Sequence, residues 1–171
     1  LIKRRLKRKN MTQNEIKFRP KAAQEDERGT IVNFLKVTED GQGFKIPNVP
    51  EGVPDDVFVE VAYISFKNSG DVRANHYHPD VSQFVYCVAG SYESTSVKLK
   101  MNETGEAQKD GEEQKIQVKA GDLVYTPPMI AHAMKTTEPN TVIININPRP
   151  RVKEQYYGGD RPHTMPFKLV E

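Results

Sequence analysis

The stretches of this chain that can form regular structure are mostly short, rich in β-branched and aromatic residues, and bounded by glycine or proline. Such side chains favour extended backbone, and glycine and proline divide it into strands joined by turns. The only helix candidate is a short turn around residues 21–27. The pattern predicts an all-β sandwich or barrel. The expected strands are 30–37, 57–66, 83–89, 92–100, 115–119, 123–126 and 141–146.

The length of 171 residues suits one domain, which we expect at residues 21–171 after a basic, flexible N-terminal tail at 1–20. The first ten residues hold six Lys and Arg and no acid, so the rest of the chain has 19 basic against 23 acidic residues. The basic stretch is interpreted as a disordered tail or as residues upstream of a natural start at Met11. It is assigned no function.

Composition excludes several classes of protein. The mean hydropathy is −0.68, and no run approaches the roughly 20 apolar residues of a membrane span. The single cysteine, Cys87, rules out a disulfide framework, and we expect it to be a buried, inert thiol. A net charge of −4 beyond the basic stretch argues against nucleic acid as a partner. No apolar signal segment follows the basic residues, so we expect a cytoplasmic protein.

The alternation of side chains gives each strand its faces. Residues 83–89 place Gln83, Val85 and Cys87 on one face and the larger apolar side chains on the other. Residues 57–66 are apolar on both faces, which predicts a strand that is covered on both sides.

Three of the four histidines occur in two suggestive places, whereas His163 has no such pattern and is expected on the surface. His76 and His78 are two residues apart, so on a strand both imidazoles leave the same face and form a pair of metal ligands. His132 follows a rigid Pro127-Pro128 corner at the end of a strand. The alternative is a polar barrel interior in which the histidines are satisfied by hydrogen bonds.

These spacings resemble the two motifs of the cupin superfamily. Residues 70–90 match G-x5-HxH-x3-4-E-x6-G with Gln83 at the Glu position, and 121–136 match G-x5-PxG-x2-H-x3-N except at Met129 and Thr136. The resemblance implies a double-stranded β-helix, the cupin jelly-roll barrel. It also implies one divalent metal, Zn, Ni, Fe, Mn or Cu, or none, held by His76, His78, Gln83 and His132.

A narrower resemblance comes from residues 73–78, Arg-Ala-Asn-His-Tyr-His, and from the Asp-Glu-Arg-Gly-Thr element at 26–30. Both look like the cupins of deoxysugar and capsule biosynthesis, including the nucleotide-sugar 3,4-ketoisomerases and 3,5-epimerases, although Ala74 replaces their glycine. The resemblance implies an isomerase or epimerase that acts on a nucleotide-linked keto-deoxysugar in polysaccharide biosynthesis.

Such a reaction needs a base that removes a proton beside a carbonyl and an acid that returns it. His76 and His78 are candidates because imidazole titrates near neutral pH. Tyr77 and Tyr125 are proton donors in one interpretation and packing residues in the other. Arg73 and Arg28 are candidates for the substrate diphosphate, with an ion pair to Asp26 as the alternative for Arg28. Asn145 and Asn147 share a strand face that suits sugar hydroxyls, or solvent.

Two other functions stay open. A mononuclear metal-dependent dioxygenase would use the same three histidines and one oxygen ligand. A non-catalytic sugar-binding cupin would use the same cavity without turnover. In each case the expected partner is a small molecule, with no nucleic acid and no membrane. We also expect a homodimer whose interface involves residues 30–66.

Overall fold

The computed structural model describes residues 14–27, 29–32, 34–54, 57–58, 60–147 and 163–171. Every regular element in these ranges is a strand. These residues form no helix that is long and apolar enough to cross a membrane. The strands are β1 (Ile16–Phe18), β2 (Gln24–Asp26), β3 (Gly29–Ile31), β4 (Lys36–Val37), β5 (Phe44–Lys45), β6 (Glu60–Ser65), β7 (Val72–Tyr77), β8 (Gln83–Ala89), β9 (Ser91–Met101), β10 (Ala107–Lys109), β11 (Gln114–Lys119), β12 (Leu123–Thr126), β13 (Ile130–Thr136), β14 (Val142–Asn147) and β15 (His163–Thr164).

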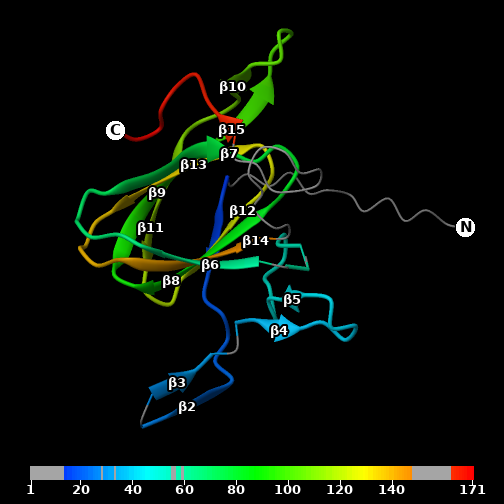
Figure 1. The fold of residues 1–171 in the computed structure, drawn as a ribbon, viewed down its shortest axis with the longest axis vertical. Coiled ribbons are helices and arrows are strands. Elements are labelled where there is room, and N and C mark those ends of the chain that lie inside the picture. The colour runs from blue at the N-terminus through cyan, green and yellow to red at the C-terminus, as the bar shows by residue number, and fades with distance from the viewer. Residues whose placement is uncertain (1–13, 28, 33, 55–56, 59, 148–162) are drawn as a thin grey trace, which may run out of the picture.

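Two antiparallel sheets curl around a common interior (Figure 1). The first has the strand order β1-β12-β8-β14-β6, and the second has the order β10-β9-β13-β7-β15, with β11 also paired to β9. Apart from the β9–β10 pair, neighbouring strands of both sheets are therefore not consecutive in the chain. This confirms the all-β jelly-roll barrel predicted from the sequence.

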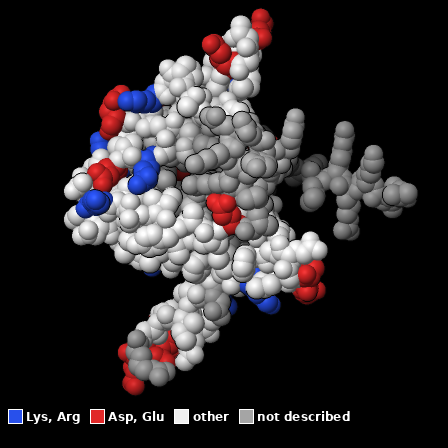
Figure 2. All heavy atoms as spheres, in the orientation of Figure 1, with Lys and Arg blue, Asp and Glu red and all other residues white. Residues whose placement is uncertain are grey.

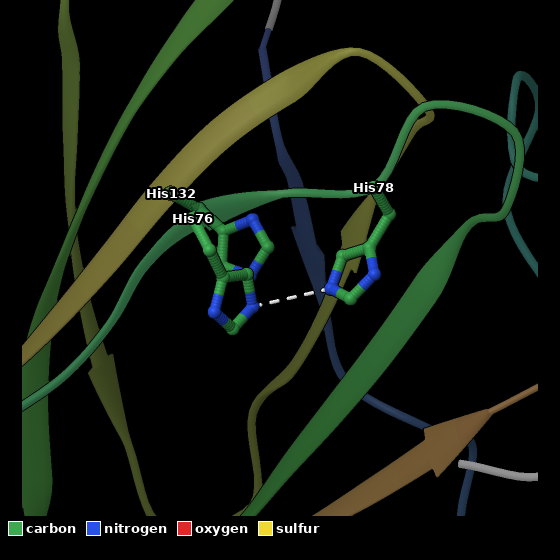
Figure 3. Close-up of side chains that lie close together, drawn as sticks. All are labelled: His76, His78 and His132. Carbon is green, nitrogen blue, oxygen red and sulfur yellow. Dashed lines mark hydrogen bonds between the residues drawn. The ribbon is translucent and has the colours of Figure 1, made fainter. Parts of the chain in front are cut away.

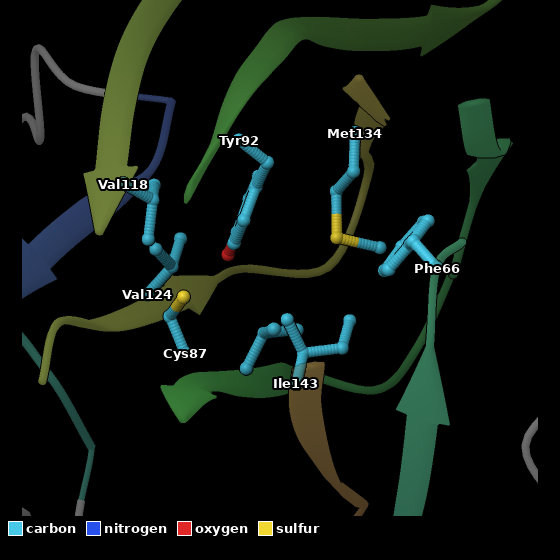
Figure 4. Close-up of a cluster of buried hydrophobic side chains, with 8 residues drawn as sticks. Phe66, Cys87, Tyr92, Val118, Val124, Met134 and Ile143 are labelled. Carbon is cyan, nitrogen blue, oxygen red and sulfur yellow. The ribbon is translucent and has the colours of Figure 1, made fainter. Parts of the chain in front are cut away.

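The barrel interior contains an apolar core contributed by both sheets (Figure 4). The predicted parity of residues 83–89 is confirmed, since Val85 and Cys87 belong to this core while Phe84 packs on the outside. Each fully buried apolar side chain of this kind contributes about 1.5–3 kcal/mol relative to exposure. The core consists of Phe66, Val85, Cys87, Tyr92, Val118, Val124, Met134 and Ile143.

A glycine is required where β8 turns into β9. Gly90 has a φ of 73°, and a Cβ at this position would overlap the side chain and backbone of Thr141. Only glycine meets both conditions without strain.

Residues between 34 and 58 cover the outer face of the first sheet. Phe58 packs edge-on against Phe84 of β8, with ring centroids 5.0 Å apart, and Phe34 stacks on Tyr86 at 4.6 Å. The cover ends at the edge strand β6, where Val61 is 44% and Tyr63 69% exposed. The prediction that residues 57–66 are covered on both sides is therefore wrong for β6.

Residues 14–20, which the sequence placed in a flexible tail, are part of the barrel. Ile16–Phe18 pairs with β12, and the Lys17 ammonium donates to the Gln117 carbonyl of β11 at 2.7 Å. Arg19 forms an ion pair with the buried Asp122 at 2.8 Å. β1 thus spans the gap between the two sheets, which corrects the predicted boundary at residue 20. Residues 1–13 of the expected tail lie outside the described residues.

The short helix expected around residues 21–27 is absent from the structure. Gln24–Asp26 is a strand, β2, paired with Gly29–Ile31 in a hairpin that projects from the barrel (Figure 1). The Gly29 φ of 130° is a backbone conformation that disfavours helix and suits this hairpin.

The C-terminal segment, residues 163–171, lies across the outside of the second sheet. His163 and Thr164 pair with Tyr77 and His76 of β7. Three apolar side chains of the segment then pack against an outer cluster that includes Tyr77 and Leu99. These three side chains are Met165, Phe167 and Leu169.

Candidate active site

The interior of the barrel changes from apolar to polar at one level. In the first sheet the register places Gln83 opposite Thr126 and Glu60 opposite Asn147. In the second sheet His132 lies opposite both Ser96 and His76. Because interior residues recur every second position, the next residues inward belong to the apolar core on several strands. We call this set the polar ring: Glu60, His76, Gln83, Ser96, Thr126, His132 and Asn147.

Three imidazoles, those of His76, His78 and His132, lie close together (Figure 3). The Nε2 atoms of His76 and His78 are 3.1 Å apart, and one nitrogen of each histidine lies within 4.8 Å of the others. The rings of His76 and His132 have centroids 4.8 Å apart. His132 reaches this position from β13, after Met129 at a φ of 61°. The structure thus brings together the three histidines that the spacing predicted.

This spacing of His76 and His78 supports two kinds of chemistry. In a hydrogen bond at 3.1 Å one imidazole donates and the other accepts, so the pair can hold and pass a proton. The same nitrogen atoms, with His132, form a donor set that suits a divalent transition metal.

Gln83 is oriented by neighbouring polar groups of the first sheet. Its Nε2 lies 3.5 Å from Asn147 Oδ1, and Asn147 Nδ2 lies 3.4 Å from Glu60 Oε1. Because the amide nitrogen of Gln83 faces Asn147, its oxygen points to the other side of the planar amide. Gln83 can therefore offer a neutral oxygen to a metal or to a ligand donor.

A cavity of about 330 Å³ opens beside His76, within the usual range for small-molecule sites. Its polar lining includes Arg73, His76, Gln83 and Asn145, and its apolar lining comes from both sheets. Asn145 is 2% exposed, and the described part of the chain offers no hydrogen-bond partner to its Oδ1. A buried acceptor without a partner costs free energy, so a donor group of a ligand would be stabilised there. The apolar lining consists of Ile64, Val72, Ala74, Val85, Met134 and Ile143.

Arg73 and His76 reach the same cavity because β7 is irregular between them. In a regular strand, residues three apart lie on opposite faces. Here Ala74 and Asn75 have φ values of 70° and 58°, and the pairing with β13 passes from His76 directly to Ala74. Asn75 is thus the extra residue of a bulge, which re-aims the side chains on either side. The Arg73 guanidinium lies 5.3 Å from the centre of the Phe66 ring.

Glu15 is an interior carboxyl that the sequence did not reveal as a site residue. It is 2% exposed and accepts hydrogen bonds from Ser94 Oγ at 2.7 Å and Thr126 Oγ1 at 2.9 Å. Burial raises the pKa of the Glu15 carboxyl, although the hydroxyl hydrogen bonds act in the opposite direction. One sequence signal for this region is the alternation of Ile16 and Phe18 with polar residues, which indicates a short strand directly after Glu15.

The two tyrosines proposed as proton donors do not join the histidines. Tyr77 faces the outside of β7, where it packs in the cluster under the C-terminal segment. Tyr125 packs against Phe84 on the outside of the first sheet, with ring centroids 4.9 Å apart. Each is one position out of phase with an interior residue, so strand alternation directs it away from the cavity. This placement favours the packing interpretation of both tyrosines. Arg28 lies outside the described residues.

The remaining candidates from the sequence lie apart from the cavity. Cys87 is fully buried in the apolar core, and burial raises the pKa of its thiol to about 11, with further contributions from Asp122 and Glu138. His163 is exposed and lies beside Tyr77. On the face shown in Figure 2, acidic and basic side chains are scattered without a broad patch of one sign.

The fold and the histidine cluster define a class of protein. Residues 63–146 match the family model of the cupin domain, so the chain carries a cupin domain that contains the three histidines and five of the seven residues of the polar ring. A comparison with curated proteins returned no match.

Solved structures with the same fold include nucleotide-sugar enzymes. A mutant 3,4-ketoisomerase from Thermoanaerobacterium thermosaccharolyticum, in complex with TDP-4-keto-6-deoxyglucose, has a TM-score of 0.56 at 18% identity, over 84% of this chain and 86% of that one. A 3,4-ketoisomerase from Helicobacter canadensis has a TM-score of 0.60 at 14% identity, over 84% and 89%. The dTDP-4-dehydrorhamnose 3,5-epimerase of Bacillus anthracis has a TM-score of 0.61 at 14% identity, over 87% and 78%.

Proposed function

We propose that the protein is an isomerase or epimerase that acts on a nucleotide-linked keto sugar. The observation that carries this proposal is that His76, Arg73, Gln83 and Asn145 line one cavity. An imidazole, a guanidinium and two amides provide a base, a phosphate ligand and hydrogen bonds for hydroxyl groups. The solved structures with the same fold include enzymes in complex with TDP or a TDP-sugar, which supports this substrate class.

The reaction is a proton transfer at carbon atoms next to a carbonyl group. Neutral His76 takes the proton from the carbon beside the keto group. The electrons of the C–H bond form a carbon–carbon double bond, and the π electrons of the carbonyl group move to its oxygen to give an enediolate. The isomer forms when the former carbonyl carbon takes a proton and the hydroxyl proton of the deprotonated carbon passes to the oxyanion. The epimer forms when the deprotonated carbon takes a proton from an acid on its opposite face. His78 stabilises the imidazolium of His76 by accepting a hydrogen bond from its Nε2–H, across the 3.1 Å between the two Nε2 atoms.

The other polar side chains of the cavity hold the substrate. Asn145 Oδ1 accepts a hydrogen bond from a sugar hydroxyl, which gives this buried oxygen the partner that the described residues do not provide. Arg73 binds a phosphate of the nucleotide, because a guanidinium can donate two parallel hydrogen bonds to phosphate oxygens. The Phe66 ring beneath Arg73 limits the directions in which the guanidinium can point.

A divalent metal is compatible with the same residues. His76, His78 and His132 supply three nitrogen atoms, and Gln83 supplies a neutral oxygen. We propose these four side chains as the ligands of a divalent transition metal if the protein binds one. Such a metal would supply Lewis acidity to polarise the keto oxygen of the substrate.

We also propose that the protein is a homodimer. The β2–β3 hairpin projects from the barrel with all six of its strand residues exposed, and an isolated two-stranded hairpin is marginally stable in water. The edge strand β6 exposes Val61 and Tyr63 beside an edge to which no described strand pairs. A second copy of the chain would cover both features.

The experiment that tests the function is incubation with TDP-4-keto-6-deoxyglucose in D₂O. We expect deuterium at a carbon next to the keto group, detected by mass spectrometry and NMR, and its loss in the His76→Asn variant. Tyr125→Phe is the matched control, because it removes one polar atom outside the cavity. Oxygen consumption without deuterium exchange would favour a dioxygenase. Binding without either reaction would favour a sugar-binding protein. Either of these two results would refute the proposal that the protein is an isomerase.

A further inference from the structure

We propose that Asn75 is a positioning residue through which residues 163–171, here called the C-terminal strap, hold the bulge that places Arg73 and His76 on one cavity. The inference rests on the proposed function only in taking that cavity as the ligand site. Asn75 itself lies on the other side of β7 and contacts the strap rather than the cavity lining.

The bulge is a conformation that the two residues do not favour by themselves. Ala74 and Asn75 both have φ in the left-handed region, at 70° and 58°. Such a conformation is uncommon for any residue other than glycine, and only Asn and Asp adopt it with some ease. Ala74 has no side-chain polar group to compensate. Two consecutive residues of this kind persist only where surrounding contacts hold them.

The strap provides these contacts. Asn75 Oδ1 accepts hydrogen bonds from the backbone N–H groups of Leu169 at 2.9 Å and Val170 at 3.2 Å, and Asn75 Nδ2 donates to the Val170 carbonyl at 2.9 Å. One side chain therefore uses its donor and acceptor groups on the strap backbone. At the other end of the strap, Thr164 pairs with His76.

Apolar packing fixes the strap against the sheet between these two attachments. Met165, Phe167 and Leu169 pack on the outer cluster that includes Tyr77, the residue between His76 and His78. The Lys109 ammonium lies 5.0 Å from the centre of the Phe167 ring. The strap thus contacts β7 on both sides of His76, at Asn75 and at Tyr77.

Loss of the strap would favour a regular strand at residues 74–75. In a regular β7 the side chains of Arg73 and His76 point to opposite faces, since one residue of slip reverses the face of every side chain beyond it. The cavity would then lose either its guanidinium or its imidazole. The docking of the C-terminal strap and the geometry of the site are therefore coupled.

Three variants of the full chain weaken the strap in different ways. Asn75→Gly keeps the left-handed backbone and removes all three hydrogen bonds to the strap. Asn75→Asp keeps the two hydrogen bonds that the side-chain oxygen accepts and loses the one that the amide nitrogen donates. Phe167→Ala weakens the strap without changing β7. Two controls are matched to them. Ala74→Gly relieves backbone strain and leaves the strap contacts in place, and Phe34→Ala removes a half-buried ring from the outside of the opposite sheet.

The measurements need no substrate. NMR of the imidazole nitrogens reports the His76–His78 hydrogen bond, and amide hydrogen exchange reports the opening of residues 72–77. We expect Asn75→Gly and Phe167→Ala to shift the signals of both histidines and to accelerate exchange in β7 by about tenfold or more, because several contacts are lost. Asn75→Asp should have a smaller effect. Ala74→Gly and Phe34→Ala should leave the histidine signals in place.

Unchanged histidine signals and β7 exchange in both Asn75→Gly and Phe167→Ala would overturn the proposal, whatever their thermal stability. A shift of similar size in Phe34→Ala would overturn it too, because the effect would then be general loosening. A second readout is the Kd for TDP, which should rise in Asn75→Gly but not in Phe34→Ala, because Phe34 lies outside the cavity. If the NMR and exchange results hold while TDP does not bind, the proposed function fails and the coupling stands.

Discussion

Thr126 and Glu15 are 111 positions apart in the chain and share a hydrogen bond of 2.9 Å inside the barrel. Thr126 ends β12 opposite Gln83, and Glu15 directly precedes β1. The second oxygen of Glu15 accepts a hydrogen bond from Ser94 of the other sheet. One carboxyl therefore connects the two sheets at the level of the polar ring, where β12 and β9 are not paired.

Glu15→Gln should change how the stability of the protein depends on pH. The folded state raises the pKa of this carboxyl above its unfolded value of about 4.3. The contribution of Glu15 to the free energy of unfolding is therefore fully present below about pH 4.3. The contribution is lost as pH rises through the folded pKa, because ionisation then opposes burial. We expect Gln, which does not ionise, to gain stability relative to wild type as pH rises from 4 to 8. Thermal unfolding of both proteins across this range measures the difference, and a constant difference would contradict the prediction.

His76→Ala and His78→Ala should abolish turnover and leave the fold intact. Removal of a positioned acid or base lowers a rate by about 10²–10⁴-fold. The expected result is a loss of deuterium exchange with an unchanged circular dichroism spectrum. Tyr77→Phe, on the same strand but outside the cavity, is the control. If activity falls only in proportion to the unfolded fraction, the histidines have no catalytic role.

Gln83→Glu should raise the affinity of the site for a divalent metal, because it replaces a neutral oxygen by a charged one beside the three imidazoles. Titration with Zn²⁺ or Mn²⁺ by calorimetry measures the change, and Gln83→Ala should lower the affinity in the same assay. Thr126→Val, which alters a neighbouring ring position without a proposed ligand, is the control. Equal affinities of all four proteins would remove Gln83 from the proposed ligand set.

Cys87 should not react with alkylating reagents in the folded protein. Its side chain is fully buried and its thiol has a pKa of about 11, so almost no thiolate forms at pH 8. We expect no mass shift with iodoacetamide at pH 8 and one complete modification after unfolding in urea. Rapid modification without denaturant would show that the core opens around Cys87.

Tyr63→Lys should convert the proposed dimer into a monomer. Tyr63 is 69% exposed on β6, and a charged side chain there opposes association of apolar surfaces. Sedimentation velocity gives the mass of each species. Met101→Lys, at a residue 47% exposed on the other sheet, is the control for the added charge. A monomeric wild type, or a variant that stays dimeric, would contradict this interface.

The histidine cluster could be predicted from the sequence because its information is local. His76 and His78 share a face through the strand period, and the Pro127-Pro128 corner delivers His132 at a fixed distance along the chain. The parity of β8 follows from the same period, which places Gln83 and Val85 on one face of the strand. The strand period and the turn residues are therefore sufficient to predict these features from the sequence.

Glu15 and the bulge could not be predicted because they depend on contacts distant in sequence. The strand signal around Ile16 is three residues long and follows a basic stretch, and its partner β12 lies more than 100 residues away. The left-handed backbone at Ala74 and Asn75 is stabilised by the strap, about 95 residues further along the chain. Strand parity by itself would put Arg73 and His76 on opposite faces, and the bulge brings both to one cavity.

In this barrel, the residues that would contact a ligand are separate from the residues that stabilise the fold. Ring residues such as Gln83 and His132 alternate on their strands with residues that face the outer clusters, and the apolar core lies further in. A substitution in the ring therefore exchanges a group that meets a ligand while the packing that holds the strands persists. A barrel arranged in this way can diverge toward new substrates by single replacements, without first having to re-evolve its stability.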